Sequence, residues 1–274
     1  MKKRKMVATI GAMCLLLASC SNIDKLLKSN DFEAKYQAAM NYYNESSYSK
    51  AIQVFENLTL YYRGKEHAED IAWYYAQALY KEKDYYTAGY QFRRFARQFP
   101  YSSERMEEAL FLSAYCRYLD SPEYSLDQSL TKAAIEEFES FTENFPRSAH
   151  VPEANAYIDE LRAKLIKKDF EIAYGYYFIE EYHAAYVSFK NFINLYPDAE
   201  QREEVMFYML KSGYLYAINS REEKKRERLQ QVVNDFERFS SVFSESKHLA
   251  ESQEIYTKTR AALAQIEKDS KNGN

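Results

Sequence analysis

The fold of this chain is decided by a stretch in its first half, Phe92-Arg93-Arg94-Phe95-Ala96-Arg97-Gln98-Phe99-Pro100. Its three phenylalanines are spaced by three and then four residues, which places them on one stripe of an α-helix. A proline directly after the third ring prevents the helix from continuing. The stretch therefore predicts an amphipathic helix that ends at Phe99.

The same phrase recurs along the chain. Its copies are Phe138-x-x-Phe141-x-x-x-Phe145-Pro146, Phe189-x-x-Phe192-x-x-x-Tyr196-Pro197, Phe236-x-x-Phe239-x-x-x-Phe243-Ser244 and a degenerate earlier one, Phe55-x-x-Leu58-x-x-x-Tyr62-Arg63. Four residues before the first ring stands a small or branched residue that lets a neighbouring helix approach: Ala51, Ala88, Ala134, Ala185 and Val232. Recurrence of one phrase indicates a repeat protein.

Each of these helices follows a second amphipathic helix across a short turn, and the offsets match the tetratricopeptide unit of about 34 residues. On that register the repeats run from Phe32 to Lys65, from Glu69 to Ser102 and from Ile166 to Ala199. The third repeat is stretched by a long turn at 119–127, and the fifth is stretched around 219–221. We expect an all-α fold, a right-handed superhelix of about five tetratricopeptide-like helix-turn-helix repeats.

The composition supports helices over sheets. The 274 residues include only 6 Gly and 5 Pro, whereas average usage would supply about 20 and 14. These two residue types make most tight turns. Their shortage favours long helices with few and short connections.

The first residues have the pattern of an export signal. A basic start at Lys2–Lys5 is followed by an apolar run at Met6–Leu17, which is too short to cross a bilayer as a helix. Leu17-Ala18-Ser19-Cys20 resembles the lipobox of bacterial lipoproteins, which implies diacylglycerol and an N-acyl chain on Cys20. An ordinary signal peptide or an uncleaved anchor is the alternative.

These signals divide the chain into four parts. We predict a signal peptide at 1–19, a lipidated tether at 20–30, a repeat domain at 31–268 and a disordered tail at 269–274. A tether of ten extended residues would reach about 35 Å. Lipid chains on Cys20 would supply the membrane attachment.

Charge and reactive groups argue against several function classes. Without the signal the chain has 33 Lys and Arg against 41 Asp and Glu, a net charge of −8, which disfavours nucleic acid as a partner. Cys116 is the one cysteine left beside Cys20, so we expect a buried thiol and no disulfide. The four histidines have no metal-ligand spacing, and no Gly-rich phosphate loop is present. We therefore expect no enzyme, no metal and no cofactor.

The first helices of the repeats carry candidate binding residues. Positions 5, 9 and 12 of the tetratricopeptide register face the concave side, and in the first two repeats they are occupied by Tyr36, Met40, Tyr43, Trp73, Gln77 and Tyr80. Rings, a thioether and a few polar groups suit an extended peptide with aromatic or aliphatic side chains. The alternative is that these residues pack one repeat on the next.

Several local phrases add a family resemblance. They are Arg97–Ser102, Leu161–Leu165, Ala173–Tyr177 with Glu181–Ala185, and Leu195–Asp198. Together with the lipobox and the repeat order they resemble the BamD family of the outer-membrane β-barrel assembly machine. The long third turn, Ser244 in place of proline and the 27 tyrosines depart from the commoner pattern.

The resemblance implies a non-enzymatic scaffold on the periplasmic face of the outer membrane. Its N-terminal repeats would receive C-terminal segments of unfolded barrel precursors, and its C-terminal repeats would hold the POTRA-bearing assembly subunit. Ser21 follows the lipid site, where inner-membrane retention calls for Asp. Another periplasmic adaptor, acting in cell-wall or secretion-pore assembly, is an alternative. A glycan-binding, transporter-associated lipoprotein is a third.

Overall fold

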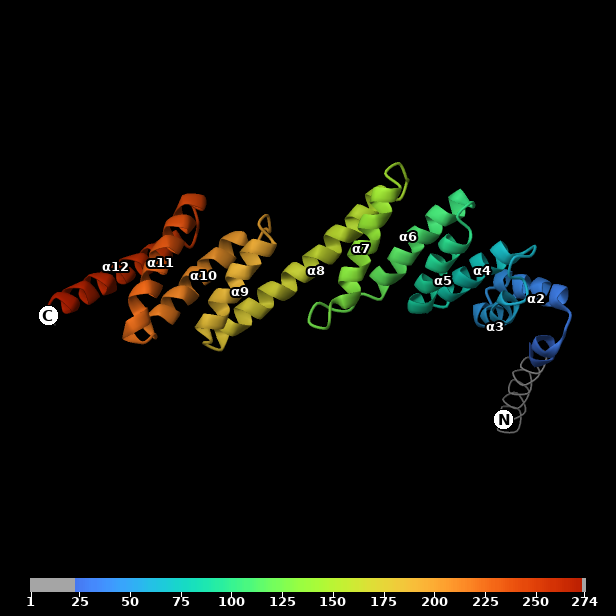
Figure 1. The fold of residues 1–274 in the computed structure, drawn as a ribbon, viewed down its shortest axis with the longest axis horizontal. Helices are drawn as coiled ribbons and strands as arrows, with labels where there is room; N and C mark the ends of the chain where they lie inside the picture. The colour runs from blue at the N-terminus through green and yellow to red at the C-terminus, as the bar shows by residue number, and fades with distance from the viewer. Residues whose placement is uncertain (1–22, 273–274) are drawn as a thin grey trace, which may run out of the picture. The chain divides into compact units, whose positions relative to one another are not determined.

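The computed structural model describes residues 23–272, and every regular element in that range is an α-helix. With the labels of Figure 1, the helices are α2 (Phe32–Asn44), α3 (Tyr48–Thr59), α4 (Ala68–Lys81), α5 (Tyr85–Gln98), α6 (Ser103–Leu119), α7 (Ser129–Asn144), α8 (Val151–Phe178), α9 (Tyr182–Leu195), α10 (Arg202–Ile218), α11 (Glu222–Val242) and α12 (Leu249–Asn272). None of the helices in the described range is long and apolar enough to cross a membrane.

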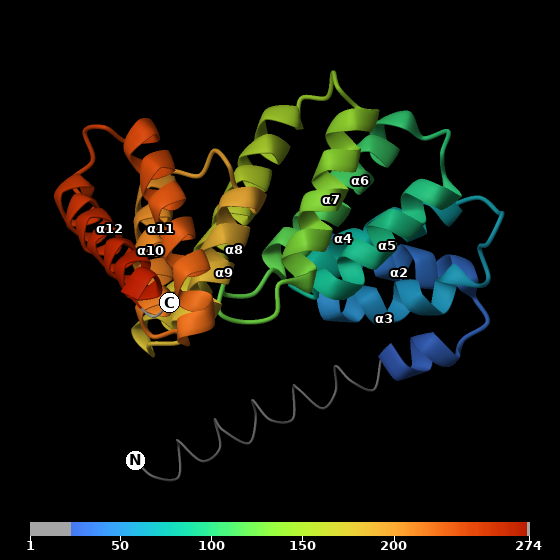
Figure 2. The ribbon, with the colours of Figure 1, turned by 60° about the vertical axis from the view of Figure 1, so that its left-hand side comes forward.

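The chain divides into two compact units. The first contains the residues up to Pro122 together with Leu126–Leu161, and the second contains Glu123–Ser125 and the residues from Arg162 onward. Helix α8 contributes residues to both units. Within each unit, helices that follow one another in the sequence lie side by side (Figures 1 and 2).

The recurring phenylalanines form the core of the first unit. The side chains of Phe55, Phe92, Phe95 and Phe138 are fully buried, and so are the alanines four residues before the first ring of each phrase. Gly89 brings α5 close to α6, because a Cβ built on it would lie 3.2 Å from the Cβ of Cys116. The predicted buried thiol is confirmed: Cys116 is buried, and burial raises its pKa to about 12.

The second unit repeats this construction. Phe189, Phe192 and Phe239 are buried among residues of α10, and Phe170 and Tyr174 of α8 pack against the same core. The prediction of an all-α fold built from tetratricopeptide-like helix pairs is confirmed, with the pairs α2–α3, α4–α5, α6–α7, α8–α9 and α10–α11.

Three of the short turns share one backbone geometry. Ser46, Lys83 and Glu180 each have a φ near +60°, in the left-handed region. In each turn the next amide donates to the carbonyl five residues back, as from Asp84 N to Leu79 O at 3.0 Å. This is the Schellman hydrogen bond that closes a helix end. The turns therefore fix the antiparallel pairing at the cost of a left-handed non-glycine residue.

The stretched repeats reach their length in different ways. The third has a nine-residue connection between α6 and α7, as the sequence predicted. In the fifth, only residues 219–221 separate α10 from α11. The extra length lies in the helices, since α10 has 17 residues and α11 has 21.

Both ends of the repeat domain differ from the sequence prediction. Residues 23–28 of the expected tether are helical, and Ile23 is buried. The Nζ atom of Lys35, which is only 2% exposed, donates to Leu27 O at 2.8 Å and to Asn57 Oδ1 at 2.7 Å. These two hydrogen bonds hold the expected tether against the first repeat.

At the other end, α12 continues to Asn272, past residue 268, where the disordered tail was expected to begin. Gln265 Nε2 donates to Asp269 Oδ1 at 2.8 Å across one helical turn. Such i,i+4 pairs support a solvated helix end. They explain why residues 269–272 remain helical.

Candidate functional site

The tyrosines predicted for α2 contact α4. Tyr36 is 8% exposed, and its ring stacks on His67 with centroids 4.1 Å apart. Burial, followed by the nearby Asp70, raises the pKa of the Tyr36 hydroxyl. Tyr43 is half-buried and meets Tyr74 edge to face at 5.0 Å. Both rings therefore join the first helix of one repeat to the first helix of the next.

The rings predicted for α4 make the same step onward to α6. The ring centroids of Trp73 and of Phe95 on α5 lie 5.3 Å apart. The guanidinium carbon of Arg105, on α6, lies 5.7 Å from the Trp73 ring centroid. Tyr80 lies 6.3 Å from Tyr115 of α6. Met40 and Gln77, half-buried on the same two helices, have no ring of their own to pack. The six predicted side chains therefore lie on α2 and α4, the first helices of two successive repeats. Their rings also pack one repeat against the next.

An ion pair fixes the start of α6 beside this series. Arg105 Nη1 lies 2.8 Å from Asp70 Oδ1 and 3.2 Å from Glu69 Oε1. Burial alone would lower the pKa of Arg105, but hydrogen bonds and charge from the two acids raise it. The cation is therefore held over Trp73, an arrangement that rings favour.

Sequence reasoning missed a recurring histidine stack. His67 on Tyr36, His150 on Phe111 and, in the second unit, His248 on Phe207 each have ring centroids 4.1 Å apart. The three histidines are far apart in the sequence, but each stands directly before the first residue of a helix: α4, α8 or α12. A histidine directly before a predicted helix start was therefore the one sequence signal that could have indicated these stacks. No group of three or more His, Cys, Asp or Glu within residues 23–272 is placed to hold a metal ion.

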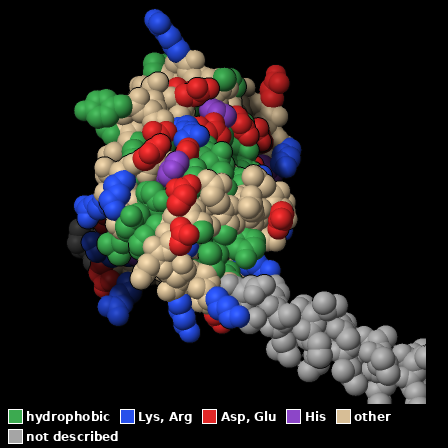
Figure 3. Space-filling model, turned by 90° about the vertical axis from the view of Figure 1, so that its right-hand side faces the viewer, with side chains coloured by type: hydrophobic (Ala, Val, Ile, Leu, Met, Phe, Trp, Pro, Cys, Tyr) green, Lys and Arg blue, Asp and Glu red, His purple; other side chains and the backbone are tan. Residues whose placement is uncertain are grey.

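Acids accompany two of these stacks in the first unit. His150 Nε2 is 2.8 Å from Glu108 Oε2, and His67 Nε2 is 3.8 Å from Glu33 Oε2. Figure 3 shows one face of the molecule, on which hydrophobic side chains are interspersed with acidic and histidine side chains. Such a surface offers apolar area together with hydrogen-bonding groups, as peptide-binding surfaces do.

Comparison with known proteins identifies the family. The model of the family described as "Outer membrane lipoprotein" (YfiO) matches residues 28–174 and 167–269. The chain belongs to this family. One curated relative of this family, "Outer membrane protein assembly factor BamD" of Pasteurella multocida (strain Pm70), is 23% identical over 217 residues, which cover 75% of this chain and 82% of the relative. The resemblance to the BamD family is therefore confirmed.

The family description, "Outer membrane lipoprotein", confirms the expected association with the outer membrane. The lipid site Cys20 and the signal peptide 1–19 lie outside the described residues. The six candidate groove residues lie on α2 and α4, the first helices of their repeats. That they line a groove and bind a peptide stays a prediction.

Proposed function

We propose that this chain is a non-enzymatic scaffold lipoprotein of the machinery that assembles β-barrel proteins in the outer membrane. Lipid on Cys20 anchors it at the periplasmic face. Its first unit binds C-terminal segments of unfolded barrel precursors, and its second unit binds the POTRA-bearing subunit. The observation that carries the proposal is the family match over nearly all the described residues, together with the relative's name.

The ring series of the first unit supports precursor binding. Tyr43, Trp73 and Tyr80 are half-buried, so each keeps part of its ring accessible while its neighbours hold it in place. Pre-ordered rings bind an extended chain at low entropic cost, and their polar tips can meet its amides.

One register position supports a different partner for the second unit. The third residue after the middle apolar position of the phrase is Tyr61, Gln98 or Asn144 in the first unit, but an aliphatic Leu195 or Val242 in the second. Leu195 is 65% exposed and Val242 is 48% exposed. Apolar side chains at the ends of two successive second helices suit the core of an interface with a folded domain.

The test uses the lipidated chain, tagged at its C-terminus, in two assays. Pull-down from solubilised outer membranes should recover a POTRA-bearing barrel subunit, and titration with the C-terminal peptide of a barrel protein should show binding. Recovery of a partner without POTRA domains would replace the proposed partner. Binding of oligosaccharides without binding of the peptide would refute the precursor assignment.

Two variants separate the two assignments. The double variant Met40→Glu and Gln77→Glu adds charge to the first unit without removing a packing ring. It should weaken binding of the peptide and leave binding of the POTRA-bearing subunit unchanged. Leu195→Lys with Val242→Lys should do the reverse. If both variants lose both partners, the division of labour between the units is wrong.

The anchor and the absence of catalysis have their own tests. Labelled palmitate should enter the wild-type chain and should not enter Cys20→Ala. Cys20→Ala should still fold and bind both partners in solution, since its effect is on location. Turnover of any precursor peptide by the purified chain would contradict the scaffold role.

A further inference from the structure

Two repeats lack the proline that follows the last ring of the phrase: the fifth has Ser244 and the first has Arg63. The other three copies have Pro100, Pro146 and Pro197. Proline at this position has no polar side chain. Arginine adds a long cationic one at the turn between α3 and α4.

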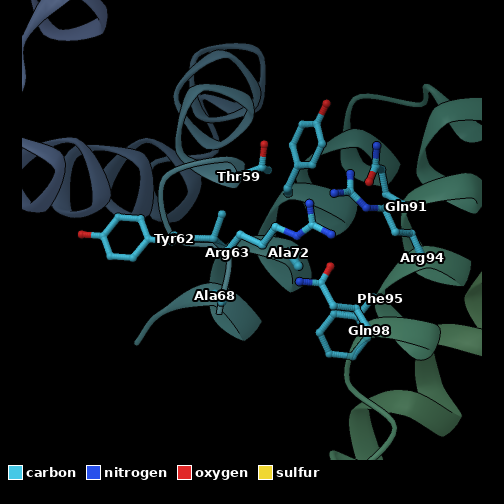
Figure 4. A pocket seen from close by; sticks show the side chains of 11 residues that line it. Thr59, Tyr62, Arg63, Ala68, Ala72, Gln91, Arg94, Phe95 and Gln98 are labelled. Carbon is cyan, nitrogen blue, oxygen red and sulfur yellow. The ribbon is translucent and has the colours of Figure 1, made fainter. Parts of the chain in front are cut away.

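That side chain enters a pocket within the first unit. Figure 4 shows Arg63 extending from the α3–α4 connection toward α5, where Gln91, Arg94 and Gln98 lie around the same space. The three α5 residues are spaced by three and four, so they share one helical face. The floor is apolar and buried, and includes Ile71 of α4 and Phe95 of α5.

The pocket is positively charged. No Asp or Glu is among the residues that line it. Neither Arg63 nor Arg94 has an ion pair with another residue of the described range, 23–272. Arg93 and Arg105 of the same unit, in contrast, each pair with acids. Two guanidinium groups and two carboxamides therefore face a space that no acid of the pocket neutralises.

The size and surroundings of the pocket indicate which chemical group it can bind. The free space at its centre is about 20 Å³, room for one small group. Guanidinium groups bind planar carboxylates through paired hydrogen bonds. Leu60, directly after the lining residue Thr59 in the sequence, is 83% exposed. A carboxylate next to an apolar side chain fits both features.

We infer that Arg63 and Arg94 bind a carboxylate of the unfolded precursor polypeptide, either an acidic side chain or the chain end, while Leu60 contacts an apolar residue next to it. The inference rests on the proposed function, because it names a second contact for the same client. The pocket lies between α3, α4 and α5, and none of the six groove residues lines it.

The experiment uses the full mature chain and a pair of unstructured peptides that are rich in aromatic residues and differ in one Glu or Gln. Wild type should bind the Glu peptide about tenfold more tightly, the value of one charge-assisted hydrogen bond. Arg63→Gln and Arg94→Gln should each lose this preference. Arg97→Gln is the matched control, since it removes the same charge from α5 outside the pocket.

Each outcome decides between the claims. Equal binding of the two peptides by wild type, or an equal loss in Arg97→Gln, overturns the pocket and leaves the proposed function in place. Arg94-dependent binding of the Glu peptide without any binding of barrel C-terminal peptides overturns the proposed function and keeps the pocket. Arg94-dependent binding of inorganic phosphate or of phosphatidylglycerol vesicles, with no response to the Glu peptide, replaces the carboxylate by a phosphate.

Discussion

Replacing Lys35 by methionine should release the helical turn at residues 23–28. The Lys35 ammonium donates to Leu27 O and Asn57 Oδ1 at 2.8 and 2.7 Å, and it lies 5.1 Å from the Phe32 ring centroid. Hydrogen bonds to a charged group contribute about 1.5–3 kcal/mol. Methionine keeps most of the buried volume, so we expect a net loss of about 2 kcal/mol, confined to this contact.

Hydrogen exchange measures the loss where it occurs. A docking free energy lower by about 2 kcal/mol corresponds to roughly thirtyfold faster exchange of the amides in residues 24–28, while α9 in the second unit serves as the internal reference. Asn57→Asp is the control, because a carboxylate should still accept from Lys35 and keep the turn docked. Unchanged exchange at 24–28 in Lys35→Met would refute the reasoning.

Four further outcomes are expected. Gly89→Ala should be at least about 1 kcal/mol less stable in urea denaturation than Gly175→Ala, because a Cβ meets Cys116 at the first site and open space at the second. Lys83→Gly should stabilise its left-handed turn by up to about 1 kcal/mol in thermal unfolding. Cys116 should react with thiol reagents only after unfolding, which mass spectrometry checks. Burial raises the pKa of Asp235, so deprotonation is disfavoured in the folded state. Wild type should therefore lose stability relative to Asp235→Asn as pH rises above about 4, as pH-dependent denaturation measures.

The sequence predicts the helices well because their core residues repeat. The rings at Phe92, Phe95 and Phe99 mark a helix face, and Pro100 marks its end. Apolar residues at this spacing indicate directly which face of the helix is buried. The spacing does not indicate whether extra residues lengthen a helix or a turn. For this reason the sequence predicts a longer turn in the fifth repeat, whereas the structure has longer helices there.

Contacts of single polar residues could not be predicted in this way. Lys35 stands on a helix like any solvated lysine, and only the approach of Leu27 and Asn57 makes it a buried donor. Arg63 looked like a degraded motif, although it enters a pocket with Arg94. For the candidate groove, the register predicted Tyr36 on the first helix of its repeat, but it did not predict that the ring of His67, directly before α4, stacks on Tyr36.

The docked turn at 23–28 changes the effective concentration of the first repeat at the membrane. Only Ser21 and Asn22 separate Cys20 from Ile23, so the proposed lipid anchor lies three residue steps, at most about 11 Å, from the first described residue. A link this short leaves the body little volume to explore. Encounter with a partner embedded in the same bilayer then becomes nearly intramolecular, and weak contacts suffice to hold the two together.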